Sequence, residues 1–140
     1  MSLPSTTHAW VIQNYSEDHI DLTPNSPSST FALKELPLPS TVPEDSILVR
    51  NLYLANDPAQ RFWLKEPKPS EETAFRAQSL NTPMSVFAAI SRVESIGGND
   101  APFKVGDLVR LSSAWSEYSV VTKESATPVP YEFSLDFATY

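Results

Sequence analysis

Thirteen prolines break this 140-residue sequence into short segments. That is roughly twice the usual share, and a proline inside a helix removes a hydrogen bond and clashes with the preceding turn. Long helices are therefore excluded over most of the chain. The segments between the prolines are rich in β-branched and aromatic residues, which favour strands. The sequence predicts a mainly β fold of roughly five to seven short strands with little helix, as a partly open β-barrel or a sandwich.

The expected strands are residues 8–15, 31–36, 47–54, 84–94, 108–111 and 115–121. Polar residues and prolines fill positions 16–30, which predicts a long turn between the first two strands. Residues 47–54 are nearly all apolar, so this strand is expected to be buried on much of both faces. One helical turn fits residues 59–64, whereas residues 70–80 fit either two turns of helix or a loop.

The chain has three glycines, Gly97, Gly98 and Gly106, and no cysteine. Phosphate-binding loops need spaced glycines so that the backbone can approach a pyrophosphate, and none of those spacings occurs. No cofactor is therefore expected to bind to this chain alone. The two histidines, His8 and His19, have no neighbour at metal-ligand spacing, so no metal site is expected. A serine triad stays open because its members need not be close in sequence, but no G-x-S-x-G elbow supports one.

Acidic residues outnumber basic ones by 17 to 10, which gives a formal charge of −7. The resulting field repels phosphate backbones, so nucleic acid is not expected as a partner. No window approaches the roughly 20 apolar residues of a membrane helix, and the start of the chain lacks a secretory signal. A soluble, cytoplasmic protein with no membrane partner is expected. With 41% apolar residues, the length suits a single domain over residues 1–140.

Three segments carry a family resemblance: ILVRNLYLANDPAQRFWL at 47–64, ISRVES followed by FKVGDLV within 84–109, and WSEYSVV at 115–121. In order and spacing they resemble L-V-R-N-L-Y-L-S-x-D-P-Y-M-R, V-x-x-S-x-x-x-x-F-x-x-G-D-x-V and W-x-E-Y. These motifs belong to the N-terminal substrate domain of medium-chain dehydrogenases/reductases. The branch is the zinc-independent one of prostaglandin reductases and plant alkenal double-bond reductases. The resemblance covers about residues 8–125 and implies a GroES-like, partly open β-barrel.

The resemblance also implies a missing half, because family members continue with a Rossmann domain that binds NADPH. The chain stops where the linker into that domain would begin, so residues 126–140 are expected to be a linker remnant beside a core of about 8–125. A chain that lacks the Rossmann domain is not expected to transfer hydride by itself. Where the family writes D-P-Y-M-R this chain has DPAQR at 57–61, and VFAA at 86–89 replaces a glycine run. Both changes suit a cleft that no longer holds nicotinamide, and the zinc ligands of alcohol-dehydrogenase relatives are absent.

Asp57, Arg61 and Tyr53 are the candidate catalytic residues. Asp57 and Arg61 are four positions apart, so they could face each other across a helical turn or hold a carbonyl substrate. The alternative is that Asp57 caps the turn and Arg61 is solvated. The Tyr53 phenol could polarise an enone oxygen, or the residue could simply belong to the core.

The candidate substrate-binding residues are Asn56, Phe62, Trp63, Trp115 and Tyr118. The four aromatic ones could line an apolar pocket beside the cleft, with core packing as the alternative for at least two of them. Glu117 occupies the acidic position of the W-x-E-Y motif, where a structural role competes with a catalytic one.

Two functional hypotheses follow from this sequence. In the first, the chain is a stand-alone, cofactor-independent enzyme that isomerises, cyclises or dehydrates an unsaturated carbonyl metabolite in the former substrate cleft. In the second, it is a non-catalytic binding or interaction module, or half of a reductase that acts only with a partner chain. An apolar face left by the missing domain would recruit a partner, and a homodimer is expected.

Overall fold

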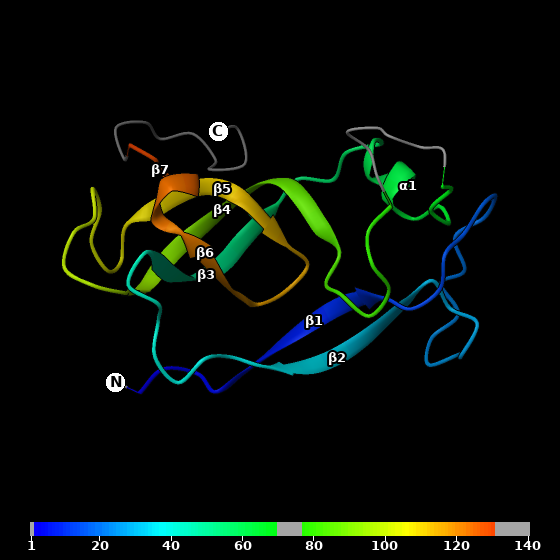
Figure 1. The fold of residues 1–140 in the computed structure, drawn as a ribbon, viewed down its shortest axis with the longest axis horizontal. Helices are drawn as coiled ribbons and strands as arrows, with labels where there is room; N and C mark the ends of the chain where they lie inside the picture. The colour runs from blue at the N-terminus through cyan, green and yellow to red at the C-terminus, as the bar shows by residue number, and fades with distance from the viewer. Residues whose placement is uncertain (1, 70–76, 131–140) are drawn as a thin grey trace.

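The computed structural model describes residues 2–69 and 77–130, which form two antiparallel sheets beside each other (Figure 1). β1 (Thr6–Ile12) and β2 (Phe31–Pro37) make a two-stranded sheet. The second sheet has the strand order β6 (Tyr118–Thr122), β3 (Ser46–Leu54), β4 (Ser85–Ile96), β5 (Leu108–Ala114) and β7 (Thr127–Pro128). The helical elements are α1 (Gln60–Trp63) and a 3₁₀ turn, η1 (Lys123–Ser125). The predicted mainly β, partly open architecture with little helix is confirmed.

The two-stranded sheet follows from alternation in the first strand. Thr7, Ala9 and Val11 are buried, whereas His8 and Trp10 point to the other, exposed face. Side chains alternate between the faces of a strand, so the antiparallel register places Glu35 opposite His8 and Leu33 opposite Trp10 on that face. The connection between β1 and β2 spans the positions predicted as a long turn.

β3 is an inner strand of the larger sheet and pairs with the edge strand β6 on one side and the central strand β4 on the other. Its first half is buried on both faces, since Ile47, Leu48 and Val49 are at most 2% exposed. The expectation of two-sided burial is wrong for the second half, where Leu52 and Tyr53 are each 42% exposed. β6 stops pairing at Arg50, and a bulge follows in the β3–β4 ladder, so no neighbouring strand covers these two side chains.

The apolar core has two main parts, one in each half of the molecule. The larger part lies on the five-stranded sheet and contains Ile47, Val49, Val93, Phe103, Val109, Leu111 and Ala126. The smaller part contains Ile12, Phe31, Leu64 and Met84, with Trp63 and Trp115 packed against it. The second cluster joins β1, β2 and the segment around α1, so it fixes the predicted helical turn against the two-stranded sheet.

The two sheets meet along β1. Isolated bridges connect Ala9 to Ser116 and Val11 to Pro83. The backbone N–H of Trp10 donates to the Trp115 carbonyl oxygen at 2.8 Å, and its own carbonyl accepts from Met84 at 2.9 Å. These few bonds join the sheets at one line and leave them apart elsewhere, which is why the barrel is open.

Two stretches remain to be described, residues 70–76 and the end of the chain from position 126. Residues 70–76, part of the stretch left open between helix and loop, lie outside the described residues. At the other end β7 adds to β5, and the flanking Ala126 and Val129 are buried, so the packed sheet continues past position 125. Within residues 2–69 and 77–130, no helix combines the length and the apolar character needed to cross a bilayer.

Gly97 lies where two backbone segments touch. Its N–H donates to the Ser46 carbonyl oxygen at 2.9 Å, and a Cβ added there would overlap the Pro43 carbonyl. Gly106 differs, since its φ of +94° is the only constraint and a Cβ would meet no atom within 4 Å.

We predict that Gly97→Ala lowers the free energy of unfolding by about 2–3 kcal/mol, because the new methyl group forces the Pro43 segment away from β3. Gly106→Ala is the matched control, and the backbone strain alone reduces stability by about 1 kcal/mol. Urea unfolding followed by circular dichroism measures both values. Equal losses in the two variants would show that the close approach at Gly97 does not limit stability.

Candidate ligand-binding groove

A groove of about 1520 Å³ lies between the face of the two-stranded sheet and one end of the five-stranded sheet. Enclosed small-molecule pockets usually have volumes of about 300–1,000 Å³, so this is an open trough with room for a ligand along its length. Its walls come from three parts of the chain that are distant in sequence. Apolar atoms form most of the surface, although about half of the lining residues have polar side chains.

The first wall is the exposed face of β1 and β2. His8, Trp10, Phe31 and Leu33 all line the groove. They share a face because strand residues two positions apart point the same way. Trp10 is 47% exposed and Leu33 is 55% exposed. Large apolar groups this accessible, side by side and opposite a second wall, form a surface suited to a flat or extended apolar ligand.

The second wall is the end of β3 together with the β5–β6 connection. Asn51 and Leu54 come from β3, Asn56 follows it, and Trp115 and Glu117 come from the connection. The Trp115 indole is held by the Phe31 ring, with centroids 5.1 Å apart and a tilt of 45°. This aromatic contact fixes the Trp115 indole against β2, and Trp10 lies next to it because the Trp10 backbone N–H donates to the Trp115 carbonyl oxygen.

The third wall is the long loop between β1 and β2, which contributes Leu22, Pro24 and Pro27 among others. Two side-chain amides at the end of β1 hold the loop in place. The Gln13 amide donates to the Ser26, Pro27 and Ser29 carbonyls at 3.0–3.3 Å, and the Asn14 amide donates to the Pro27 and Ser29 carbonyls at 2.9 Å. The loop is therefore tied to the strand that forms the first wall.

Glu117 and His8 meet at the mouth of the groove. One Glu117 oxygen, Oε2, accepts from the His8 backbone N–H at 3.2 Å and lies 3.1 Å from His8 Nδ1. The other ring nitrogen, Nε2, is 3.8 Å from a Glu35 carboxylate oxygen. The hydrogen bond from the His8 backbone, followed by the one from its ring, lowers the pKa of Glu117 below its ordinary value of 4.5.

Asn51 connects four strands through its side-chain amide. Its Oδ1 accepts from Ser91 Oγ at 2.8 Å and from Ser113 Oγ at 2.9 Å, which reaches β4 and β5. Its Nδ2 donates to the Ser116 carbonyl at 2.9 Å and to Ser119 Oγ at 3.1 Å, which reaches the β5–β6 connection and β6. Its backbone N–H donates to the Glu117 carbonyl at 2.9 Å. The amide is thus saturated, and its role is to position the second wall.

A smaller hollow of about 290 Å³ gathers four of the sequence-predicted site residues, Asn56, Asp57, Arg61 and Trp115. Asp57 Oδ1 accepts from the Ala59 N–H at 2.7 Å, while the Gln60 side chain accepts from the Asp57 N–H at 2.8 Å. These two bonds hold the turn before α1, although the N-cap residue Ala59 itself has no side-chain cap. The described residues include no ion pair between Asp57 and Arg61.

Arg61 holds the β1–β2 loop. Its guanidinium donates to the Ser16 carbonyl at 2.7 Å and to the Glu17 carbonyl at 3.0 Å. Asn56 differs from its neighbours in the hollow, because its side-chain amide has no hydrogen bond to any described residue. It also lines both the hollow and the larger groove. Its donor is therefore available to a ligand.

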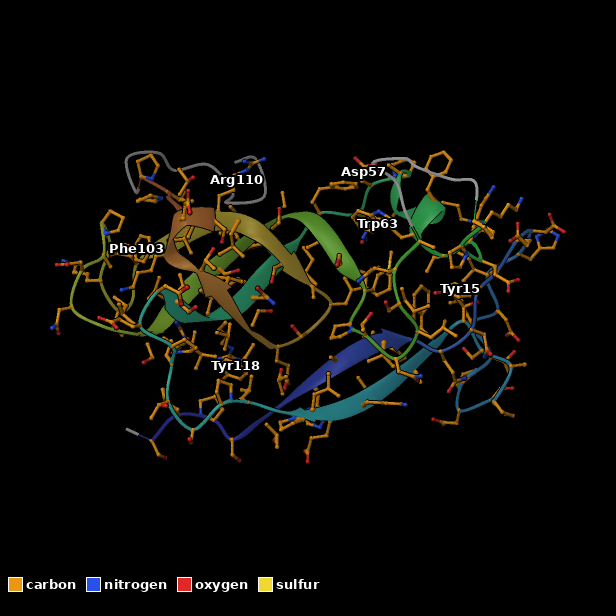
Figure 2. The ribbon with its side chains drawn as sticks, viewed as in Figure 1. Tyr15, Asp57, Trp63, Phe103, Arg110 and Tyr118 are labelled. Atoms are coloured by element: carbon orange, nitrogen blue, oxygen red, sulfur yellow. The ribbon has the colours of Figure 1, made fainter. Side chains whose placement is uncertain are left out.

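The other predicted residues lie outside both spaces. Tyr53 is on the uncovered end of β3, and Phe62 is 52% exposed on α1, with the Lys65 ammonium 6.0 Å from its ring centroid. The Trp63 ring packs on Phe87 at 4.5 Å. Figure 2 shows Asp57 and Trp63 beside α1, whereas Tyr118 lies where β6 faces the two-stranded sheet. The Tyr118 backbone N–H donates to Thr7 Oγ1 at 3.0 Å.

Sequence reasoning missed His8, Trp10, Leu33 and Asn51 as parts of the site. The alternation in β1 could have assigned Trp10 to the exposed face. No local signal marks His8, because its partner Glu117 is 109 positions away and Glu35 is its neighbour only through strand register.

The described residues do not fit a nicotinamide dinucleotide. Gly97, Gly98 and Gly106 lie around β4 and β5, and none lines the groove or the hollow. α1 has four residues, too few to direct a row of free N–H groups at a pyrophosphate. Across residues 2–69 and 77–130, no three His, Cys, Asp or Glu side chains are grouped so that they could hold a metal ion.

The family is decided by a model of the N-terminal domain of oxidoreductase, which matches residues 20–129. This chain belongs to that family. It is 32% identical over 96 residues to an NADP(+)-dependent 2-alkenal reductase of Nicotiana tabacum, a match covering 67% of this chain and 26% of that protein. It is 24% identical over 119 residues to an uncharacterized membrane protein of Saccharomyces cerevisiae, covering 83% and 31% respectively.

The fold agrees with the sequence match. CurA from Vibrio vulnificus, solved in complex with NADPH, has a TM-score of 0.67 at 18% identity over 91% of this chain and 34% of CurA. The predicted GroES-like N-terminal domain of medium-chain reductases is thereby confirmed. The chain spans about a quarter to a third of the length of these relatives.

The lowered pKa of Glu117 predicts a pH-dependent stability. A carboxylate whose pKa is lower in the folded state stabilises the fold above its ordinary value of 4.5, and this contribution is lost as pH falls through the folded-state pKa. Glu117→Gln should therefore be less stable than the parent near neutral pH, and the gap should close on acidification. Urea unfolding at a series of pH values measures this difference in the free energy of unfolding. Glu124→Gln is the control, and a difference that does not change with pH would contradict the lowered pKa of Glu117.

Proposed function

We propose that this oxidoreductase-family domain binds a small unsaturated carbonyl compound in the groove. The observation that carries the proposal is that two indole side chains, Trp10 and Trp115, line one groove together with Asn56, whose side-chain amide has no hydrogen bond to any described residue. The indole faces suit a conjugated chain, and the amide N–H suits a carbonyl oxygen. The name of the tobacco relative, a 2-alkenal reductase, supports the same class of compound.

We further propose that the bound compound reacts without a nicotinamide, by isomerisation, cyclisation or dehydration. These reactions move protons and need no hydride, which suits a groove whose residues do not fit a dinucleotide. Asp57, Arg61 and Tyr53 stay candidates for catalysis. Asp57 and Arg61 already hold the turn and the loop, which favours positioning roles for both.

Binding is tested with a linear α,β-unsaturated ketone that quenches tryptophan fluorescence. Asn56→Ala should weaken binding of the ketone by about tenfold, the loss of one hydrogen bond to a desolvated carbonyl. The alkene lacking the carbonyl should bind both proteins equally. Asn99→Ala, in an exposed loop away from the groove, is the matched control. Equal affinity of the ketone for parent and Asn56→Ala would remove Asn56 from the site, and no saturable quenching would overturn the proposal.

The second candidate is an interaction module, either a homodimer or half of a reductase working with a partner chain. Four large side chains at the end of β3 and beside it support it: Leu52, Tyr53, Phe62 and Phe87 are 42–52% exposed. Apolar groups gathered at one end of a sheet favour association, and a second copy of the chain is the simplest occupant.

Light scattering at micromolar concentration tests the homodimer. We expect a mass twice that of one chain, and the double variant Leu52→Ser, Tyr53→Ser should return it to the monomer because it removes apolar area from the contact. Val105→Ser, an exposed apolar site elsewhere, should leave the dimer intact. A monomeric parent protein would contradict this candidate.

A further inference from the structure

We propose that His8 is a catalytic base in the groove, positioned by Glu117, and that it moves the double bond of a β,γ-unsaturated ketone into conjugation. This inference rests on the proposed binding of an unsaturated carbonyl compound. His8, the proposed base, lies outside the three family motifs. Glu117, the positioning residue, occupies the acidic position of the W-x-E-Y motif.

The contact between the two residues fixes the imidazole. Glu117 Oε2 is 3.1 Å from His8 Nδ1 and also accepts the His8 backbone N–H at 3.2 Å, so the carboxylate is held by two donors of one residue. A carboxylate beside Nδ1 selects the tautomer that carries the proton there. Nε2 then presents a lone pair. Its nearest charged neighbour, Glu35 Oε2 at 3.8 Å, is beyond hydrogen-bond distance.

The charges around His8 suit a base that becomes cationic during the reaction. Glu117 faces it from the β5–β6 connection and Glu35 faces it from β2, so two carboxylates stabilise an imidazolium. Arg50 on β3 acts on Glu117 and favours its ionised form. His8 is 54% exposed, so protons exchange readily with water between turnovers.

The groove brings a ligand to this base. His8 and Trp10 lie two positions apart on the same face of β1, and Trp115 and Glu117 lie beside them on the bridged β5–β6 connection; all four line the groove. A ligand chain lying along the two indoles passes the imidazole of His8. Asn56 lies on the same wall as Trp115, with its amide available to a carbonyl oxygen.

The reaction needs only proton transfer. His8 Nε2 takes a proton from the carbon between the carbonyl and the double bond, and the electrons of that C–H bond form a dienolate. The imidazolium then returns the proton to the γ-carbon, and the double bond lies between the α- and β-carbons. His8 ends neutral, no atom is oxidised or reduced overall, and no co-reactant is consumed.

The experiment uses the 140-residue chain with a linear β,γ-unsaturated ketone. Formation of the conjugated enone is followed by its ultraviolet absorbance, and binding is measured separately by tryptophan quenching with the α,β-unsaturated ketone. We expect about a hundredfold acceleration over the buffer reaction, the scale of a single positioned base. His8→Gln should bind the ketone as the parent does and convert no faster than buffer. His19→Gln, the other histidine and not part of the groove, should match the parent.

Glu117→Gln distinguishes positioning from a structural role. The rate should fall by about tenfold. The fall should lie in kcat with the KM for the β,γ-unsaturated ketone unchanged, because the imidazole loses its fixed orientation while the groove still binds the ketone. Variants are checked by circular dichroism for an intact fold. A rate lowered through KM alone would overturn the positioning role.

The outcomes separate this inference from the function on which it rests. A parent chain that binds the ketone but shows no conversion above buffer overturns the catalytic role of His8 and leaves the binding proposal standing. Conversion that survives in His8→Gln also overturns it. A parent chain that neither binds nor converts overturns both.

Discussion

The side-chain amide of Asn51 is the interaction on which the rest of the structure depends. A single residue on β3 reaches Ser91 on β4, Ser113 on β5 and Ser119 on β6, while its backbone holds the Glu117 carbonyl. Ser91 is fully buried, so its hydroxyl must be paired, and the amide supplies the acceptor. In a sheet of short strands, each with few ladder bonds, this network fixes the register of four strands at once and sets where the second wall of the groove stands.

The groove follows from how little joins the two sheets. β1 meets the larger sheet through two isolated bridges and through backbone bonds along its length from His8 to Ile12, so the sheets touch along this one strand and diverge from it. Because the barrel is open, Trp10 and Leu33 stay exposed and line the groove together with Trp115. The same openness leaves Leu52 and Tyr53 without a cover at the far end of β3.

Six of the seven strands could be predicted approximately from the sequence, because alternation, β-branching and proline act within a few residues of one another. β7 was not predicted, and residues 115–117 belong to the β5–β6 connection rather than to a strand. The family motifs then predicted the fold, because three of them occur in register. The hydrogen bonds that make the site could not be predicted in this way. His8 is paired by Glu117 from 109 positions away, and Asn51 by serines on three other elements, so each partner is defined only after the strands have assembled.

The DPAQR turn at 57–61 matches a family motif, but its charged side chains have structural contacts. Asp57 and Arg61 were the natural candidates because of their charge, yet their polar atoms are engaged by the Ala59 N–H and the Ser16 and Glu17 carbonyls. The Arg61 guanidinium stabilises the loop by binding two carbonyl oxygens. Moving it to a ligand would cost free energy, because those acceptors would lose their donor. By contrast, the Asn56 amide and His8 Nε2 have no hydrogen bond to any described residue, since the Glu35 carboxylate oxygen lies 3.8 Å from Nε2. In this domain an available donor or acceptor atom is therefore a better guide to the reactive residues than charge or motif.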